Sequence, residues 1–368
     1  MAESQTAGGH PTRQRDGWVT PTLVAFCAAS AAITVVAGLV QVSFGSYSMT
    51  LLEAWEAVVD PAVLFDGDAW RAFLLGEELP EMGSNSLVVW EIRLPRVFVA
   101  IITGATLAIS GAIFQGVTRN ELASPFVLGV SSGAGFAVLA TLVVFSGLTT
   151  FLPFIATAGG TVAFLIVYVI AWKGGTSPVR LVLAGVIVNM VFQSLQQGLF
   201  FFADDLGVVQ TAISWLTGSL TGTGWSEVRM AAIPAVVAIV AALAGARQLN
   251  VLLLGERTAR SLGMRVETIR FGLSAVAILA ASVAISVAGV VSFFGLVVPH
   301  IVRNVVGSDY RPLMIGCLFA GPALMVVADV GARLALGGTQ LPVGVVTGLV
   351  GGPYFLYLMR RQRSMGEL

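Results

Sequence analysis

The chain has 368 residues, of which 56% are hydrophobic and 11% are charged. Soluble domains average about 45–50% apolar and about 25% charged residues, so this composition excludes an ordinary soluble enzyme. Basic and acidic residues balance at 20 each, which leaves no net field to attract nucleic acid. The two cysteines, Cys27 and Cys317, both lie in apolar runs, so a disulfide framework or a cysteine-based zinc cluster is excluded.

Long apolar stretches alternate with short polar ones along the chain. A polar tail, residues 1–18, precedes Val19 to Phe44, which stays uncharged for longer than the roughly 20 residues that a membrane helix needs. A secretory signal would have an apolar region of only about 7–15 residues, so we interpret this stretch as a retained span. We expect an all-helical multi-pass protein of the cell membrane with about ten transmembrane helices. The nine further stretches are residues 97–115, 126–145, 151–172, 181–202, 230–246, 271–288, 289–302, 313–330 and 341–358.

The distribution of positive charge predicts the orientation. An even number of spans places both termini on one side, and cytoplasmic segments are enriched in Lys and Arg. With both termini cytoplasmic, fifteen basic residues lie inside and five outside. We therefore expect cytoplasmic tails at residues 1–18 and 362–368 and a single transmembrane domain over residues 19–361.

An acidic segment, residues 45–92, does not fit a span and is expected outside the membrane. Thr50 and Glu53 have the spacing of a capping box, which predicts a short helix after Thr50. Two interpretations stay open for the segment, a solvated acidic connection and a binding surface.

A second charged segment, residues 249–270, is expected in the cytoplasm. Gly255 and Gly263 bracket a short predicted helix as a start and a left-handed cap would. A short capped helix between two spans suits docking into a groove on a partner. The alternative is a plain surface loop. The residues of the candidate docking helix are Gly255, Glu256, Arg257, Ala259, Arg260, Leu262 and Gly263.

The chain offers little for covalent chemistry. Ser131 lies in a Gly-x-Ser-x-Gly pattern, but that motif needs a strand-to-helix turn and a nearby histidine base, and small residues at this spacing also pack membrane helices. A P-loop needs a lysine after a glycine-rich turn, and the single lysine, Lys173, follows Ala171 and Trp172. We therefore expect no catalytic residue here, and any ATP hydrolysis must occur on a separate chain.

Two ionisable positions lie close to apolar spans. Asp329 and Arg333 are four residues apart on a predicted helix, which suits a structural pair, with a proton site as the alternative. His300 follows Pro299, and a metal site there would need ligands that the chain lacks. We expect His300 to be a hydrogen-bonded packing residue and the chain to hold no metal.

A series of motifs resembles one family, the ABC-transporter permeases that import iron-siderophore complexes, haem and cobalamin. The resemblance extends from about Val19 to Arg361. The motifs, in order, are RLPR at 93–96, SGA at 110–112, RNELASP at 119–125, LAG at 183–185, WLTG at 215–218, LGE at 254–256, GLVVPH at 295–300, AD at 328–329, LPVG at 341–344 and GGPYF at 351–355.

The resemblance implies a complex of two permease subunits, two ATPase subunits that hold ATP and Mg²⁺, and one external substrate-binding protein. This chain would itself bind no cofactor. The segment from Gly255 to Gly263 would be the coupling helix that docks on the ATPase. External docking of the binding protein would use Arg93, Arg96 and Arg333, and the pathway and gate would involve Asn120, Leu122, Asn189 and Gln193.

Two features differ from the family pattern. Glu121 replaces the usual proline after Arg119 and Asn120, and the acidic external segment is unusually long. The expected function is that of an importer permease for a large metal chelate, a ferric siderophore, cobalamin or haem. The competing hypotheses are an ion-coupled secondary transporter and an intramembrane hydrolase that uses Ser131.

Overall fold

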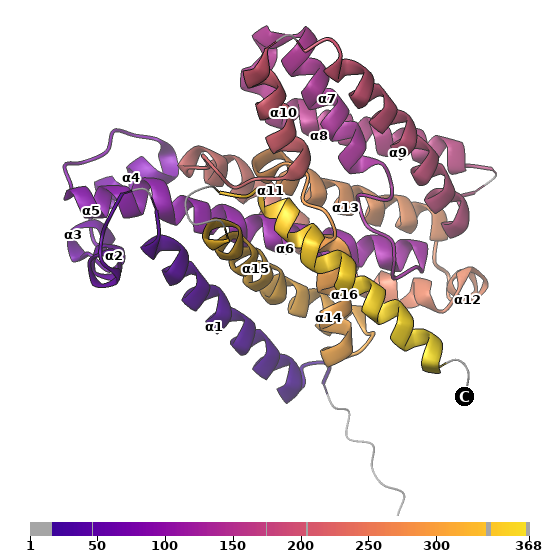
Figure 1. The fold of residues 1–368 in the computed structure, drawn as a ribbon. Helices are drawn as coiled ribbons and strands as arrows, with labels where there is room; N and C mark the ends of the chain where they lie inside the picture. Colours follow the sequence, from indigo (N-terminus) through magenta and orange to yellow (C-terminus); the bar gives the residue numbers. More distant parts are fainter. Residues whose placement is uncertain (1–16, 46, 174, 204, 336–339, 366–368) are drawn as a thin grey trace, which may run out of the picture.

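The computed structural model describes residues 17–45, 47–173, 175–203, 205–335 and 340–365, and the described residues form helices and no strand (Figure 1). Most of the polar tail predicted over residues 1–18, and the end of the one over 362–368, fall outside these ranges. Among the described residues, seven helices are long and apolar enough to cross a membrane. They contain α1 (Pro21–Ser43), α6 (Leu94–Thr118), α8 (Leu152–Ala171), α9 (Pro178–Phe200), α11 (Trp225–Leu253), α13 (Val266–Ala288) and α15 (Tyr310–Leu334).

Shorter apolar helices complete the bundle. They are α7 (Val130–Val144), α10 (Leu206–Thr217), α14 (Phe294–Val306) and α16 (Val343–Met365). The ten predicted spans all correspond to helices, which confirms the predicted fold class. The helix α10 is an addition that the sequence analysis did not predict, because its 12 residues are too few to span a bilayer.

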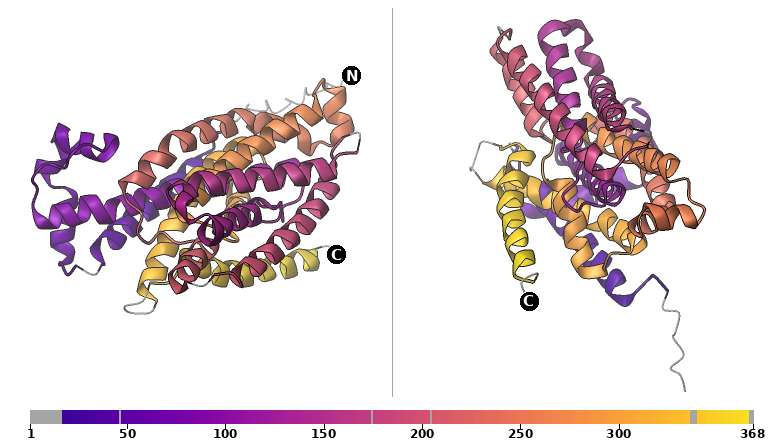
Figure 2. Two further views of the ribbon diagram at one scale, coloured as in Figure 1. Left: turned by 90° about the horizontal axis from the view of Figure 1, so that it is seen from above. Right: turned by 90° about the vertical axis from the view of Figure 1, so that its right-hand side faces the viewer.

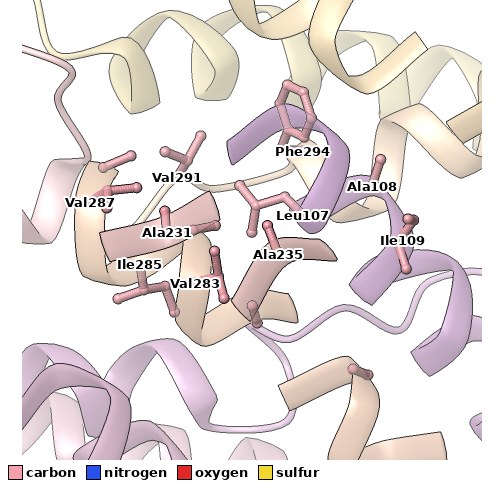
Figure 3. Packing of buried hydrophobic residues seen from close by; sticks show 14 of the residues in the cluster. Leu107, Ala108, Ile109, Ala231, Ala235, Val283, Ile285, Val287, Val291 and Phe294 are labelled. Atoms are coloured by element: carbon pink, nitrogen blue, oxygen red, sulfur yellow. The ribbon is translucent and has the colours of Figure 1, made fainter. Parts of the chain in front are cut away.

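The core of the bundle lies along α6, which packs against α11, α13, α14 and α15. In Figure 3, Leu107 of α6 lies among Ala231 and Ala235 of α11 and Val283 of α13. Glycines permit the close approach: a Cβ on Gly111 would lie 1.7 Å from the carbonyl oxygen of Gly295 in α14. Such small-residue contacts are how membrane helices bring their backbones together.

The structure shortens one predicted span. We expected helix from residue 289, but α14 begins at Phe294. Gly289 ends α13 with a positive φ of 68°, and the N–H of Val290 donates to the carbonyl oxygen of Trp215 at the end of α10. Residues 289–293 are therefore tied to α10 and do not form a turn of helix.

The acidic segment, residues 45–92, is folded. It contains α2 (Leu51–Val58), α3 (Pro61–Leu64), α4 (Gly67–Leu75) and α5 (Ser84–Leu87), and Thr50 and Glu53 form the predicted capping box. Trp90 and Phe73 stack with centroids 5.6 Å apart, and the indole N–H of Trp225 donates to the carbonyl oxygen of Trp90 at 2.7 Å. These aromatic contacts attach the segment to α11.

A short helix, α12 (Glu256–Ser261), lies at the opposite end of the molecule from α2–α5 (Figure 1 and Figure 2). The predicted flanking glycines both have a positive φ, 97° at Gly255, which precedes the helix as its N-cap, and 81° at Gly263, the expected left-handed cap. Both positions favour glycine because a Cβ would be strained there. The pattern of glycines thus confirms the predicted bounds of the helix.

Candidate functional site

The three predicted docking arginines come together at the end of the molecule that carries α2–α5. Arg93, Arg96 and Arg333 line one cavity of about 830 Å³, with Tyr47 and Gln340 also on its wall. The sequence analysis placed all three on the same side, and the structure brings them to one cavity. Their guanidinium groups are not free, however, because each is bonded within the chain.

Arg96 of α6 pairs with Asp329 of α15. Its Nε donates to Oδ2 at 2.8 Å and its Nη2 to Oδ1 at 2.5 Å, and the side-chain amide of Gln41 donates to the same carboxylate at 2.6 Å. The predicted pairing of Asp329 with Arg333 is therefore wrong. The fork of Arg96 matches the carboxylate with two parallel bonds, which is stronger and more directional than a pair within one helix.

Arg93 and Arg333 bind the C-terminal end of α1. Arg93 Nη1 donates to the carbonyl oxygen of Val42 at 2.6 Å, and Arg333 Nη1 donates to that of Gln41 at 3.0 Å. The last carbonyl groups of a helix have no partner within it, and cations stabilise that end. Arg93 is 4% exposed, whereas Arg333 is only partly buried. Of the three, Arg333 has the most accessible charge.

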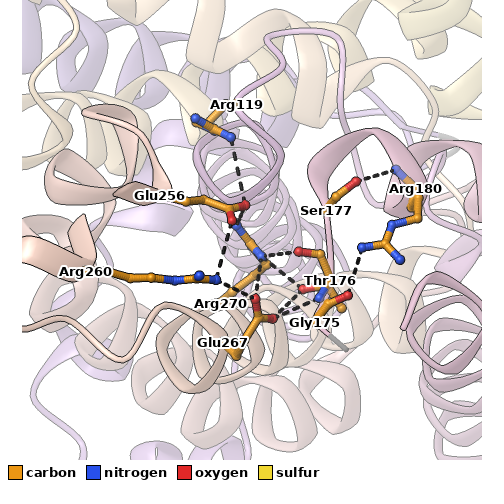
Figure 4. Close-up of polar contacts among 9 residues, drawn as sticks. All are labelled: Arg119, Gly175, Thr176, Ser177, Arg180, Glu256, Arg260, Glu267 and Arg270. Atoms are coloured by element: carbon orange, nitrogen blue, oxygen red, sulfur yellow. Dashed lines mark hydrogen bonds and ion pairs between the residues drawn. The ribbon is translucent and has the colours of Figure 1, made fainter. Parts of the chain in front are cut away.

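At the other end, α12 is held by a network of ion pairs (Figure 4). Glu256 lies 2.6 Å from Arg270 of α13, and Arg260 lies 3.7 Å from Glu256 and 3.8 Å from Glu267. Arg119, at the end of α6, lies 3.9 Å from Glu256. The predicted coupling residue Glu256 is thus an internal anchor of the helix.

The predicted docking residues do not all lie on the outer surface around α12. Ala259 is fully buried against its own chain, whereas Leu262 is 63% exposed and Arg257 is exposed. A helix of two turns held by its neighbours buries one face on them, and Ala259 lies on that face. The surface available to a partner therefore includes Leu262 and Arg257 but not Ala259.

The predicted gate lies beside α12. Arg119 ends α6 in the left-handed region with φ of 49°, and the side chain of Asn120 accepts a hydrogen bond from the N–H of Leu122 at 2.9 Å. Leu122 is 44% exposed. The turn that follows α6 is thus stabilised by its own side chain.

Glu121 connects this turn to α14. Its carboxylate lies 3.4 Å from Arg303 and 3.7 Å from Nδ1 of His300, and Arg303 also donates to the side-chain oxygen of Gln115 at 2.9 Å. His300 thus packs against a carboxylate at this turn. A proline at this position would supply none of these contacts.

Asn189 and Gln193 of α9 share a polar cavity of about 220 Å³ with Ser131 and Ser132 of α7 and Gln196 of α9. The amide of Gln196 donates to the carbonyl oxygen of Ser132 at 2.7 Å, which joins the two helices. Only 22% of the most apolar part of α9 is buried, so most of this helix faces away from the rest of the chain. The wall of the cavity combines neutral amides and hydroxyls with the apolar side chains of Phe126, Phe200, Leu216 and Val290.

The residues considered for hydrolytic or metal chemistry have other surroundings in the structure. No group of three or more His, Cys, Asp or Glu side chains that could hold a metal ion occurs among them. Ser131 lies in α7 after a turn, not after a strand, and His300 faces Glu121.

The sequence analysis missed several residues that the structure makes central. Arg270 is 1% exposed and contacts both Glu256 and Glu267, and Gln41 binds Asp329. The signal for Arg270 was its position, a charge at the fifth residue of an apolar helix. Glu267 lies three residues before Arg270 in α13, but Glu256 lies on α12, and the sequence alone could not identify that contact.

Comparison with known proteins agrees with the fold. The profile of the FecCD transport family matches residues 33–361. The Fe(3+)-citrate import system permease protein YfmD of Bacillus subtilis is 37% identical over 281 residues, covering 76% of this chain and 84% of that protein. The cobalamin import system permease protein BtuC of Halobacterium salinarum is 37% identical over 358 residues, covering 92% and 96%.

A solved structure shares the architecture. The chain superposes with a TM-score of 0.77 and 24% identity on a transporter of the metal-chelate ABC type in an inward-facing conformation, covering 92% of this chain and 99% of that one. The apolar helices and the family together make this a multi-pass protein of the cell membrane. With the family profile matching most of its length, the chain belongs to the FecCD transport family.

Proposed function

We propose that this protein is the permease subunit of an ATP-driven importer for a large metal chelate. The observation that supports this most is α12, a short helix fixed between two long apolar helices at the end opposite α2–α5. Its glycine caps and ion pairs make it rigid, and Leu262 and Arg257 are exposed on it. A rigid exposed helix of this kind suits docking into a groove of an ATPase.

ATP and Mg²⁺ would be bound by that separate ATPase, since this chain has no P-loop lysine. Two ATPase subunits would dock on two permease copies, and this chain would bind no cofactor itself. Closure of the ATPase dimer would displace α12 and so change access to the pathway.

A second copy of the permease would complete the pathway. Asn189 and Gln193 line a cavity on α9, and the same helix exposes Leu183, Ile187 and Met190. An apolar face of this size must be covered by lipid or by another helix. We infer that α9 helices of two copies enclose the route, with lipid around the remaining apolar surface.

The substrate class comes from the relatives. Their names refer to Fe(3+)-citrate, iron(3+)-hydroxamate, cobalamin and hemin. These are large metal chelates, and an external binding protein would deliver one of them to the arginine-lined cavity. Arg333 is the best placed of the three arginines to meet a carboxylate on that protein, because its charge is the most accessible.

The competing ion-coupled transporter would need a carboxylate free to change its protonation. Asp329 is 1% exposed and is bound by Arg96 and Gln41, so its carboxylate is already compensated. This geometry favours a structural role for Asp329 and weighs against ion coupling at that position.

The test is purification after mild detergent extraction, followed by reconstitution in liposomes with the co-purifying ATPase and the external binding protein. We expect ATP-dependent uptake of one member of a panel of ferric citrate, a ferric hydroxamate, cobalamin and haemin. Uptake driven by an ion gradient, with no ATPase bound, would refute the proposal and support the ion-coupled alternative.

A further inference from the structure

A buried arginine joins the docking helix to the segment before α9. Arg270 Nη2 donates to Glu256 of α12 at 2.6 Å, while Nη1 donates to the carbonyl oxygen of Thr176 at 2.6 Å and to its hydroxyl at 3.0 Å (Figure 4). The two ends of one guanidinium therefore hold two different elements. Glu267 reinforces the junction, because its Oε2 accepts from both the N–H and the hydroxyl of Thr176.

The segment around Thr176 is fixed in turn to α9. The side chain of Ser177 caps the helix by accepting from the N–H of Arg180 at 3.3 Å, and Arg180 Nη2 donates to the carbonyl oxygen of Gly175 at 2.9 Å. These two bonds join Ser177 and Gly175, which precede α9, to Arg180 in the first turn of that helix. A displacement of Thr176 must therefore move the first turn of α9 with it.

The contacts of Arg270 are rigid, unlike the ion pairs of Arg260 and Arg119 with Glu256. Arg270 is 1% exposed, and removing a partner from a buried guanidinium strongly destabilises the protein. The planar fork of Arg270 also fixes the angle between the groups that it binds. Arg260 and Arg119 are 60% and 36% exposed and lie 3.7–3.9 Å from Glu256, so solvent weakens their contribution.

We propose that Arg270 is a positioning residue that transmits displacement of α12 to the cytoplasmic end of α9. This inference rests on the proposed function and adds the route by which docking of an ATPase reaches the pathway. Coupling between two sites is reciprocal in free energy. The position of α9 therefore also sets how α12 is presented to the ATPase.

The test compares Arg270→Gln with the control Arg265→Gln, which removes an equal charge from the same segment. Arg265 is exposed and forms no ion pair with any described residue. For the substrate that the wild-type complex transports, we expect Arg270→Gln to retain the ATPase and hydrolyse ATP while uptake per ATP falls roughly tenfold. Arg265→Gln should keep the wild-type ratio. An unchanged ratio in Arg270→Gln, or loss of the ATPase from it, would overturn the inference.

A second measurement follows the motion directly and needs no substrate. Spin labels at Val179, an exposed position in the first turn of α9, report the distance between the two copies after Cys27 and Cys317 are replaced. ATP should change this distance in the wild type and in Arg265→Gln but not in Arg270→Gln. An equal change in all three would refute the route through Arg270.

A milder variant keeps the test valid if Arg270→Gln does not fold. Thr176→Val removes the hydroxyl that Arg270 and Glu267 bind, and Thr176→Ser retains it. We expect uptake per ATP to fall in the valine variant and to be restored in the serine variant, and equal ratios in the two would overturn the inference. Failure of the proposed function is distinguishable, because the wild type would then show no ATP-dependent uptake.

Discussion

Arg96 and Asp329 form a buried two-pronged ion pair that joins α6 to α15. The two side chains are 6% and 1% exposed, and Gln41 adds a bond from α1, so three helices meet at one carboxylate. The pair lies beside the arginine-lined cavity. It therefore fixes the wall of the surface at which we expect an external partner to bind.

Removal of the Asp329 charge should destabilise the protein severely. Asp329→Asn leaves the buried Arg96 guanidinium uncompensated, at a cost of about 3–5 kcal/mol. Asp68→Asn is the matched control, because its pair with Arg71 is 76% and 64% exposed and contributes about 0–1 kcal/mol. Thermal unfolding in detergent measures both. Equal melting temperatures in the two variants would contradict a structural role for the buried pair.

The predicted orientation can be tested with single cysteines in a chain that lacks Cys27 and Cys317. A cysteine at Asp66, before α4, should react with a membrane-impermeant thiol reagent in intact cells, and one at Arg257, in α12, should not. The expectation rests on the enrichment of basic residues in cytoplasmic segments. Labelling at Arg257 from outside would reverse the orientation and remove the basis for ATPase docking.

The exposed side chain of Leu262 offers the sharpest test of docking. Leu262→Asp should prevent binding of the ATPase, because a charge without a partner would enter an apolar contact. The permease should remain folded, since the side chain of Leu262 is exposed when no partner is bound. Thr268→Asp adds the same charge at an exposed position in the first turn of α13 and should retain the ATPase. Co-purification measures both, and an ATPase that stays bound to Leu262→Asp would count against docking through α12.

The external arginines should separate into two classes. Arg333→Gln should slow association with the binding protein on the order of tenfold and reduce its dependence on salt, since an accessible charge steers encounter. Arg93→Gln should instead lower the melting temperature, because Arg93 is buried and satisfies carbonyl groups at the end of α1. Surface plasmon resonance and thermal unfolding distinguish the effects. An association rate in Arg333→Gln that equals the wild-type rate would exclude this residue from docking.

Glu121 should hold the turn after α6 against α14. Glu121→Gln removes the charge that faces Arg303 and His300, so the turn should open more often. A cysteine at Leu122 should then react faster with a thiol reagent in inside-out vesicles than it does beside wild-type Glu121. Glu81→Gln, an exposed position in the external segment, is the control and should not change the rate. A rate unaffected by Glu121→Gln would show that the turn is held by Asn120 alone.

Features set by local sequence were predictable from the sequence itself. The apolar stretches determined the ten predicted helices because a membrane span needs about 20 apolar residues. Gly255 and Gly263 determined the bounds of α12 because the left-handed backbone favours glycine, and Thr50 with Glu53 determined the start of α2. Each of these features depends on residues only a few positions apart.

The tertiary structure decided which charges meet. Arg96 and Asp329 are 233 positions apart, and Arg270 and Thr176 are 94 apart, so no local spacing could predict either pair. Arg333 is nearer to Asp329 in the sequence, but Asp329 pairs with Arg96. The packing of α6 on α15 presents the guanidinium fork of Arg96 to the carboxylate. Burial of Ala259 likewise follows from what α12 packs against. The sequence determined most of the helices, although not α10 or the start of α14. The packing of the helices determined which charges could be buried together, because a charge leaves water only where a partner is held in place to receive it.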